Sequence, residues 1–226
     1  MIHRLNSCVL VPAYNEEKKI GAVLEGLRER GFKVVVVDDG STDGTSRVVR
    51  ESGAYCITFP VNRGKGAAIR KGFEWVVSNR FEAVVIMDAD GQHHPDELED
   101  FLNELTPVET DIVVGNRMNY PQQMPLVRRW TNRIMSRIVS AVAGQEIPDS
   151  QCGYRALTQQ ALHTLKLATD RFEIESEMLM QAGRRGLKIK SIPITSLYRD
   201  EISHIRPLQD TLRFFSFLIR FIFSPY

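Results

Sequence analysis

The chain has 226 residues, of which 43% are apolar and 25% charged, so it can bury a sizeable core without disulfides or structural metals. A formal net charge of +1 excludes the broadly basic surface typical of nucleic-acid-binding proteins. The cysteines match no zinc-binding spacing and predict reduced thiols. No run reaches the roughly 18 apolar residues of a membrane-spanning helix, and the N-terminal apolar run is too short for a signal peptide, so we expect a cytoplasmic protein.

The first half of the chain alternates apolar runs with amphipathic segments. The apolar runs predict strands at residues 7–13, 33–40, 55–60, 82–88 and 111–115. The segments between them predict helices at residues 16–31, 45–53, 64–79 and 95–105. This order predicts an α/β fold with a doubly wound, mostly parallel sheet and flanking helices.

The second half has a different pattern. It predicts a long basic helix at 126–144, a short strand at 153–157, helices at 158–165 and 174–186, and a late strand at 187–195. No repeat or low-complexity linker separates the halves, so we expect one domain over residues 1–226. Its expected parts are a nucleotide-binding half at 1–117, an acceptor half at 118–211 and a C-terminal tail at 212–226.

Polar residues follow the predicted strands of the first half, in the segments "PAYNEE", "DDGSTDGT", "NRGKG", "DADGQHH" and "GNR". In open α/β sheets, ligands bind beyond the carboxyl ends of the strands. The sequence therefore predicts a binding site at this edge of the sheet.

Asp88, Asp90 and Gln92 follow the central predicted strand at alternate positions. Residues two apart in an extended segment point the same way, and carboxylate and amide oxygens are ligands that Mg²⁺ or Mn²⁺ prefers. We expect a divalent ion carrying a diphosphate to be the positive partner of the two carboxylates. The alternative is an acidic turn that caps the helix beginning near Pro95.

Two further loops suggest contacts to a nucleotide. Asp39 follows a buried strand, where a carboxylate can accept hydrogen bonds from ribose hydroxyls or base nitrogens; a simple turn that caps the next helix is the alternative. Gly66, rather than Ser or Thr, follows Lys65, so the loop is not a Walker motif. Lys65 at a helix N-terminus can still meet an anion, with a solvated lysine as the alternative.

Arginines are frequent in the second half, and their forked donors suit phosphate. The candidates are Arg117, Arg128, Arg129, Arg133, Arg155, Arg199 and Arg206. Arg117 is the strongest of them because it ends a predicted strand beside the carboxylates. A solvated face is the alternative for the basic helix at 126–143.

With these motifs, the chain resembles glycosyltransferase family 2 enzymes of the GT-A fold, above all the dolichyl-phosphate mannose synthases and related polyprenyl-phosphate glycosyltransferases. The matching segments run in order over almost the whole chain: "PAYNEE", "DDGSTDGT", "NRGKGAAIRKG", "DADGQHHPDEL", "GNR", "DSQCGYRAL", "FEIESEML" and "IPI" before "YR". The chain departs from the pattern after Arg199, because "YRDEISHIRP" has His204 where the family group carries a lysine.

The resemblance implies roles for particular residues. Those expected to hold the nucleoside of a GDP- or UDP-sugar are Pro12, Ala13, Glu16 and Asp39. Those expected to hold Mg²⁺ or Mn²⁺ and its diphosphate are Asp88, Asp90 and Gln92. Arg117 and Arg128 would receive the phosphate of a lipid acceptor, and Arg199 would close over the donor.

The implied reaction is an inverting hexosyl transfer from GDP-mannose or UDP-glucose to a polyprenyl or dolichyl phosphate. A lipid phosphate is already an anionic nucleophile, whereas a hydroxyl acceptor would need a general base. Asp149 is the candidate base, and a turn or capping residue is the alternative reading of it. A sugar-nucleotide pyrophosphorylase and a non-catalytic binding module are the competing functions; the former resemble chains with a G-x-G-T-R loop, which is absent here.

The chain ends in "TLRFFSFLIRFIFSPY", where Arg213, Ser216 and Arg220 form a narrow polar stripe on an otherwise apolar helix. Such a helix suits the interface of an anionic membrane leaflet. We expect peripheral contact with the cytosolic face of a membrane. Packing against the body or against a second subunit of a homo-oligomer is the alternative.

Overall fold

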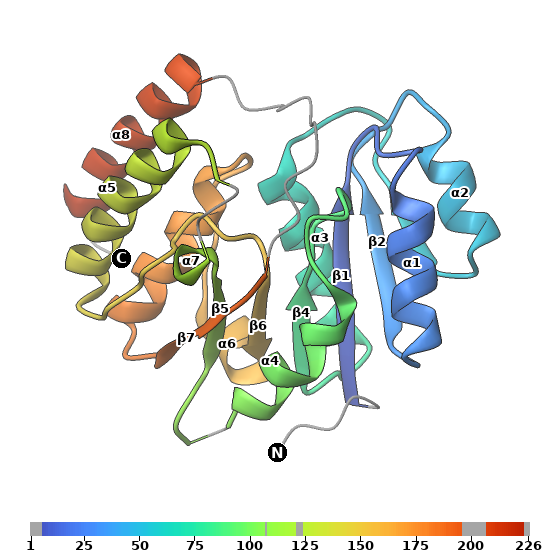
Figure 1. Ribbon diagram of the computed structural model, residues 1–226, viewed down its shortest axis with the longest axis horizontal. Helices are drawn as coiled ribbons and strands as arrows, with labels where there is room; N and C mark the ends of the chain where they lie inside the picture. Colours follow the sequence, from blue (N-terminus) through green and yellow to red (C-terminus); the bar gives the residue numbers. More distant parts are fainter. Residues whose placement is uncertain (1–5, 107, 121–123, 196–206, 224–226) are drawn as a thin grey trace.

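The computed structural model describes residues 6–106, 108–120, 124–195 and 207–223, with the side chains of the last helix described from Arg213 onward (Figure 1). The strands are β1 Ser7–Ala13, β2 Lys33–Asp38, β3 Tyr55–Thr58, β4 Ala83–Ile86, β5 Ile112–Asn116, β6 Arg155–Thr158 and β7 Ile189–Pro193. The helices are α1 Ile20–Glu29, α2 Thr45–Glu51, α3 Lys65–Ser78, α4 Leu98–Glu104, α5 Leu126–Ala143, α6 Gln159–Thr164, α7 Glu173–Arg184 and α8 Pro207–Phe223. Short 3₁₀ turns, η2 Pro95–Glu97 and η3 Arg117–Asn119, precede α4 and follow β5.

The strands form a single sheet in the order β3-β2-β1-β4-β6-β5-β7. All the strand pairs are parallel except those of β6, which runs antiparallel between β4 and β5. The prediction of a mostly parallel α/β sheet is confirmed. The reversed β6 has a consequence for function, because the start of this strand lies at the same edge as the ends of its neighbours.

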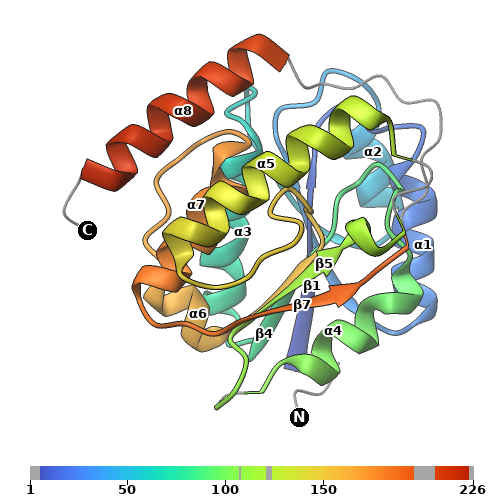
Figure 2. The ribbon, with the colours of Figure 1, turned by 60° about the vertical axis from the view of Figure 1, so that its left-hand side comes forward.

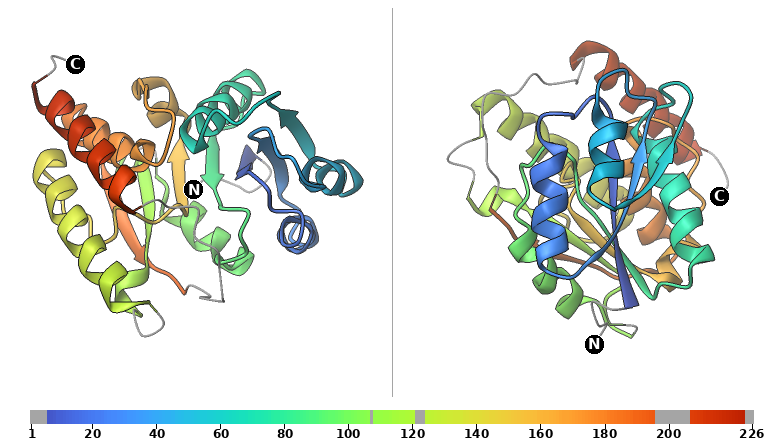
Figure 3. Two further views of the ribbon diagram at one scale, coloured as in Figure 1. Left: turned by 90° about the horizontal axis from the view of Figure 1, so that it is seen from above. Right: turned by 90° about the vertical axis from the view of Figure 1, so that its right-hand side faces the viewer.

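Helices cover both faces of the sheet, with α3 and α6 on one face and α1 and α4 on the other (Figure 3). Every residue of β1 and β4 is therefore buried, which explains why their sequences are almost continuously apolar. The predicted face of α1 is confirmed, since Ile20, Val23, Leu24 and Leu27 are all buried. The predicted stop also holds, because Gly31 adopts a φ of 72° just after α1.

α5 and α8 both lie against α7, on the side of the molecule beyond β5 and β7 (Figures 1 and 2). α8 buries Phe214, Leu218 and Phe221, and the Arg184 side chain of α7 donates to the Phe221 carbonyl at 2.8 Å. The alternative that the C-terminal tail packs against the body is thus confirmed for one face of this helix. Within the described ranges, no helix is both long and apolar enough to cross a bilayer.

Candidate active site

The loops after β1 and β2 form one braced unit. Asn15 donates its backbone N–H to Ser41 Oγ at 2.9 Å, and its side-chain oxygen accepts from the Thr42 N–H at 2.8 Å. Glu16 donates its backbone N–H to Thr45 Oγ1 at 2.8 Å. These bonds explain the positive φ of Asn15, 55°, which a short polar side chain tolerates better than most. The residues predicted to contact the nucleoside in this region therefore belong to a hydrogen-bonded part of the sheet edge. Pro12 and Ala13 are buried there, and Glu16 is half-buried.

Asp39 organises the loop before α3. Its carboxylate accepts from the backbone N–H groups of Arg63 and Gly64 at 2.7 and 2.8 Å, and from the Asn62 side chain at 2.9 Å. Burial raises the pKa of Asp39 above its usual value, although the two backbone donors oppose that shift. The residue has a structural task that the sequence did not indicate. A nucleoside contact by Asp39 stays a prediction.

Lys65 begins α3 and lies between two carboxylates from distant parts of the chain. Its Nζ is 2.7 Å from Asp88 Oδ1 and 2.6 Å from Glu175 Oε1. Burial by itself would lower the pKa of Lys65, but the two carboxylates outweigh burial and raise it, so the side chain is an ammonium. The alternative of a solvated lysine is wrong, because only 15% of the side chain is exposed.

The Asp88 carboxylate therefore has a positive partner within the protein. Burial alone would raise the pKa of Asp88, but the neighbouring Lys65 ammonium outweighs it and holds the pKa below its usual value. Lys65 Nζ is the cation in contact with Oδ1, at 2.7 Å. We expected a divalent ion to be the positive partner of Asp88, but the Lys65 ammonium is also a positive partner of this carboxylate.

The surroundings of Asp88 are close-packed. A Cβ on Gly153, in the loop before β6, would clash with the Asp88 carboxylate. His93 is buried with its Nε2 3.9 Å from Asp88 Oδ2, and its ring lies against that of Tyr154 at 4.9 Å between centroids. Burial lowers the pKa of His93 to about 4, so the imidazole is neutral at pH 7. The antiparallel β6 thus supplies one wall of the site.

Asp88, Asp90 and Gln92, which follow β4, provide too few ligands for Mg²⁺ or Mn²⁺ unless the phosphates of a bound substrate complete the site. Asp90 and Gln92 are tied by a 2.9 Å bond from the Gln92 N–H to Asp90 Oδ1, across Gly91 with its φ of 72°. Among the described residues, no three acidic, histidine or cysteine side chains are grouped to hold a metal. Mg²⁺ commonly uses one or two carboxylates plus substrate phosphates, so Asp88 and Asp90 fit such an ion once the Lys65 ammonium leaves Asp88 Oδ1.

Arg117 and Asp149 form a buried ion pair. Arg117 Nε and one terminal nitrogen donate to the two Asp149 oxygens at 2.7 and 2.9 Å, and the Arg117 backbone N–H donates to Oδ2 at 3.2 Å. Arg117 is 4% exposed and Asp149 is fully buried. Asp149 therefore holds Arg117 in place at the end of β5. Its contacts are those of a structural partner rather than of a base that faces an acceptor.

The other predicted arginines are dispersed. Arg155 is fully buried and donates to the carbonyls of Ser150, Cys152 and Glu175 at 2.5–2.8 Å, so its assignment as a phosphate ligand is wrong. Arg128 is half-buried in the first turn of α5. Arg199 lies outside the described residues, as do Arg206 and His204.

Sequence reasoning missed the carboxylates of α7. Glu175, 7% exposed, holds Lys65, and the fully buried Glu177 accepts from the backbone N–H groups of Ala168 and Thr169 at 3.0 and 2.9 Å. The available signal was that Glu175 and Glu177 stand among apolar residues of a predicted helix, because charged side chains in such a segment are rarely buried without a partner. Their partners lie too far away in the chain to be identified from sequence.

Comparisons with known proteins identify the family of the chain. Residues 8–166 match the family model of glycosyl transferase family 2. The glycosyltransferase AglJ of Haloferax volcanii is 34% identical, over 90% of this chain and 67% of its own length. The UDP-N-acetylglucosamine–dolichyl-phosphate N-acetylglucosaminyltransferase of Methanococcus voltae is 31% identical, over 85% of this chain and 86% of its own.

A solved structure shows the same fold. The glucosyl-3-phosphoglycerate synthase of Mycobacterium tuberculosis, in complex with Mn²⁺, UDP and its glucosylated product, superposes with a TM-score of 0.70 at 22% identity. The match covers 96% of this chain and 78% of that one. The family match favours the glycosyltransferase prediction over a pyrophosphorylase or a non-catalytic module. The chain therefore belongs to glycosyl transferase family 2, has the GT-A fold and is a glycosyltransferase.

Proposed function

We propose that this glycosyltransferase moves a hexose, mannose or glucose, from GDP-mannose or UDP-glucose to a polyprenyl or dolichyl phosphate, with inversion at the anomeric carbon. The observation that carries the proposal is the buried pair of Arg117 and Asp149. A hydroxyl acceptor needs a general base to remove its proton, and among the described residues of the acceptor half the buried acids Asp149 and Glu175 each hold a cation instead. A phosphate nucleophile needs no base. The Methanococcus voltae relative, named for its dolichyl-phosphate acceptor, supports the same choice.

The residues after β4 are assigned to the donor diphosphate. Asp88, Asp90 and Gln92 would hold Mg²⁺ or Mn²⁺, which neutralises charge that develops on the departing nucleoside diphosphate. Lys65 contributes a further positive charge beside Asp88. Pro12, Ala13, Glu16 and Asp39 are assigned to the nucleoside because they line the neighbouring braced edge.

The arginines are assigned to the acceptor. Arg117, with its orientation set by Asp149, and Arg128 on α5 would bind the acceptor phosphate, because the planar, forked guanidinium can donate to two phosphate oxygens at once. The reaction then depends mainly on positioning and fixed charge, with the nucleophile already ionised. Arg199 is assigned to closure over the donor.

A substrate panel tests this function. Radiolabelled GDP-mannose, UDP-glucose and UDP-N-acetylglucosamine are each incubated with a polyprenyl phosphate, and with the matching polyprenol, in the presence of Mg²⁺ or Mn²⁺. We expect lipid-soluble label from one of the hexose donors, only with the phosphate acceptor and only with metal. Equal transfer to the polyprenol would contradict the phosphate acceptor. Transfer from UDP-N-acetylglucosamine alone would correct the sugar and keep the acceptor.

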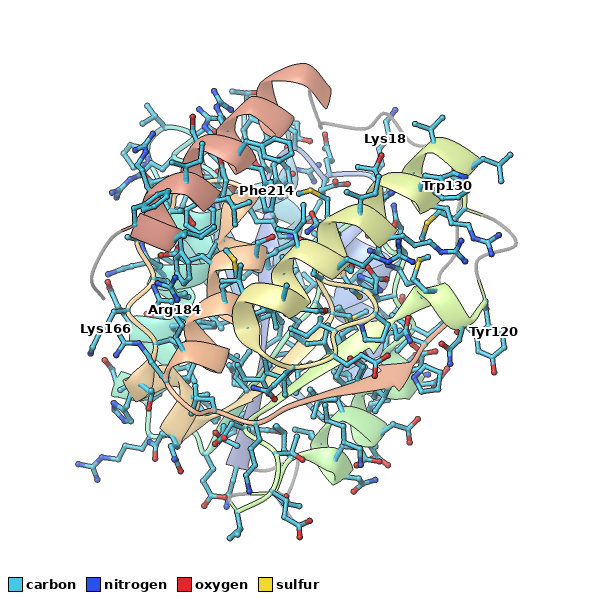
Figure 4. All side chains as sticks on the ribbon, turned by 90° about the vertical axis from the view of Figure 1, so that its left-hand side faces the viewer. Lys18, Tyr120, Trp130, Lys166, Arg184 and Phe214 are labelled. Atoms are coloured by element: carbon cyan, nitrogen blue, oxygen red, sulfur yellow. The ribbon has the colours of Figure 1, made fainter. Side chains whose placement is uncertain are left out.

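We propose further that the outer faces of α5 and α8 contact a membrane. Large apolar side chains that are at least 44% exposed lie on both helices: Leu126, Val127, Trp130 and Ile134 on α5, and Phe215, Ile219, Ile222 and Phe223 on α8. Figure 4 labels Trp130 on α5. The intervening charges are all arginines, and neither Leu126–Ala143 nor Arg213–Phe223 contains an acidic residue. Apolar side chains with a purely basic complement suit an anionic leaflet better than a protein surface.

Replacing Phe215 and Ile219 together by serine is expected to weaken binding to anionic liposomes at least about tenfold, because both side chains would otherwise enter the interface. They are 44% and 58% exposed, so the fold should persist, whereas deleting residues 212–226 would uncover α7. Liposome sedimentation measures the effect. Val61→Ser, at a 64% exposed position in the loop between β3 and α3, is the matched control. Unchanged liposome binding, with a loss of self-association in sedimentation experiments, would instead assign the face to a second copy.

A further inference from the structure

The ammonium of Lys65 occupies the side of Asp88 that a metal ion would need. Lys65 Nζ lies 2.7 Å from Asp88 Oδ1, while Oδ2 faces His93 and the carboxylate packs against Gly153. An ammonium and a divalent ion repel each other strongly at the distance that one shared oxygen imposes. Both cations cannot occupy their best positions on this carboxylate at once.

Glu175 is a second carboxylate partner that can hold the Lys65 ammonium after it leaves Asp88. Its Oε1 is 2.6 Å from Lys65 Nζ, and its side chain is 10% exposed, so the pair is shielded from solvent. The position of Glu175 is fixed by the buried Arg155, which donates to the Glu175 carbonyl at 2.5 Å. The Lys65 backbone is also restrained, since Gly64 and Gly66 pack against residues 169–171 without room for a Cβ. A small rotation of the lysine side chain can therefore release Asp88 while the contact with Glu175 is kept.

We propose that Lys65 and the divalent cation compete for Asp88, and that Glu175 is the positioning residue that retains Lys65 when the metal enters. This inference rests on the metal site in the proposed function. It makes metal binding weak in the absence of a donor, because the ion must displace an ammonium. A donor diphosphate offers that ammonium a new anionic partner, so metal and donor bind cooperatively.

The test is a double-mutant cycle on metal affinity, measured without nucleotide by electron paramagnetic resonance of free Mn²⁺. In the full chain, Lys65→Met is expected to tighten Mn²⁺ binding about tenfold, since Asp88 loses its internal cation. In an Asp88→Asn background the same substitution should change the affinity little. Glu175→Gln should weaken Mn²⁺ binding, because Lys65 then relies on Asp88 alone.

Two further variants separate the alternatives. In Lys65→Met alone, a metal ion could take the place of the ammonium and bind Glu175. Lys65→Met/Glu175→Gln removes that carboxylate, so tighter Mn²⁺ binding in the double variant comes from Asp88 itself. This variant also leaves no unpaired Glu175, which protects the fold if Lys65→Met alone is unstable. Lys71→Met is the matched control, because Lys71 lies on the same helix but is 46% exposed and paired with Glu74. It should leave Mn²⁺ affinity unchanged.

The outcomes distinguish the two proposals. Equal Mn²⁺ affinity in the wild-type and Asp88→Asn proteins would place the metal elsewhere and overturn the proposed metal site. Loss of affinity in Asp88→Asn, with none of the tightening in either Lys65→Met variant, would leave that site standing and overturn the competition. Tightening of equal size in the Asp88→Asn background would also overturn it, because the lysine would then act only through its general field.

Discussion

Asp149→Asn is expected to lower the free energy of unfolding by about 3 kcal/mol, because it removes the negative charge to which the buried Arg117 guanidinium donates two hydrogen bonds. Both side chains are nearly inaccessible to solvent, and two parallel hydrogen bonds join them, so water cannot replace the missing carboxylate. Urea denaturation followed by circular dichroism measures the effect. Transfer to a polyprenyl phosphate should fall in parallel, since Arg117 loses the contact that orients it.

This substitution also separates the two roles considered for Asp149. A general base would give a large loss of turnover with little loss of stability, and its loss would change the pH profile. A structural partner gives a large loss of stability, part of which Arg117→Met/Asp149→Leu should recover because no unpaired charge remains. Asp170→Asn is the matched control: it breaks an exposed pair with Arg70, and its effect should stay below about 1 kcal/mol. Unchanged stability in Asp149→Asn would contradict the structural assignment.

Asp90→Asn is expected to reduce the rate of sugar transfer by roughly 10²- to 10³-fold at saturating donor, through lost stabilisation of the leaving diphosphate. The substitution keeps the shape of the side chain and an oxygen that can accept from the Gln92 N–H, so the loop after β4 should keep its conformation. Initial rates at increasing Mn²⁺ measure the effect, and high metal concentration should restore part of the activity.

Asp100→Asn provides the comparison, because this carboxylate is exposed in the first turn of α4. It should transfer sugar at the wild-type rate with the same metal dependence. Wild-type turnover by Asp90→Asn at low Mn²⁺ would show that the carboxylate after β4 does not hold the ion, and would remove the basis for the metal assignment.

The sequence by itself determined the elements and the edge at which the site lies. Strands covered on both faces must be almost wholly apolar, as β1 and β4 are, and a helix with one covered face shows its period, as α1 does. These patterns depend on residues close together in the chain. The polar segments after the strands then had to gather at one edge, because parallel strands end together. The family motifs added the chemistry of a sugar transfer.

Only the tertiary structure decided which charges meet. Lys65 and Glu175 are 110 residues apart, Arg117 and Asp149 are 32 apart, and no local pattern relates the members of either pair. The reversal of β6 was equally invisible, although it brings Gly153 against Asp88. Arg155 was predicted to be a phosphate ligand, because its sequence neighbours do not show that its guanidinium donates to three carbonyls. A buried charge is defined by the partners that the fold brings to it, so its role follows from long-range contacts that a local sequence pattern does not contain.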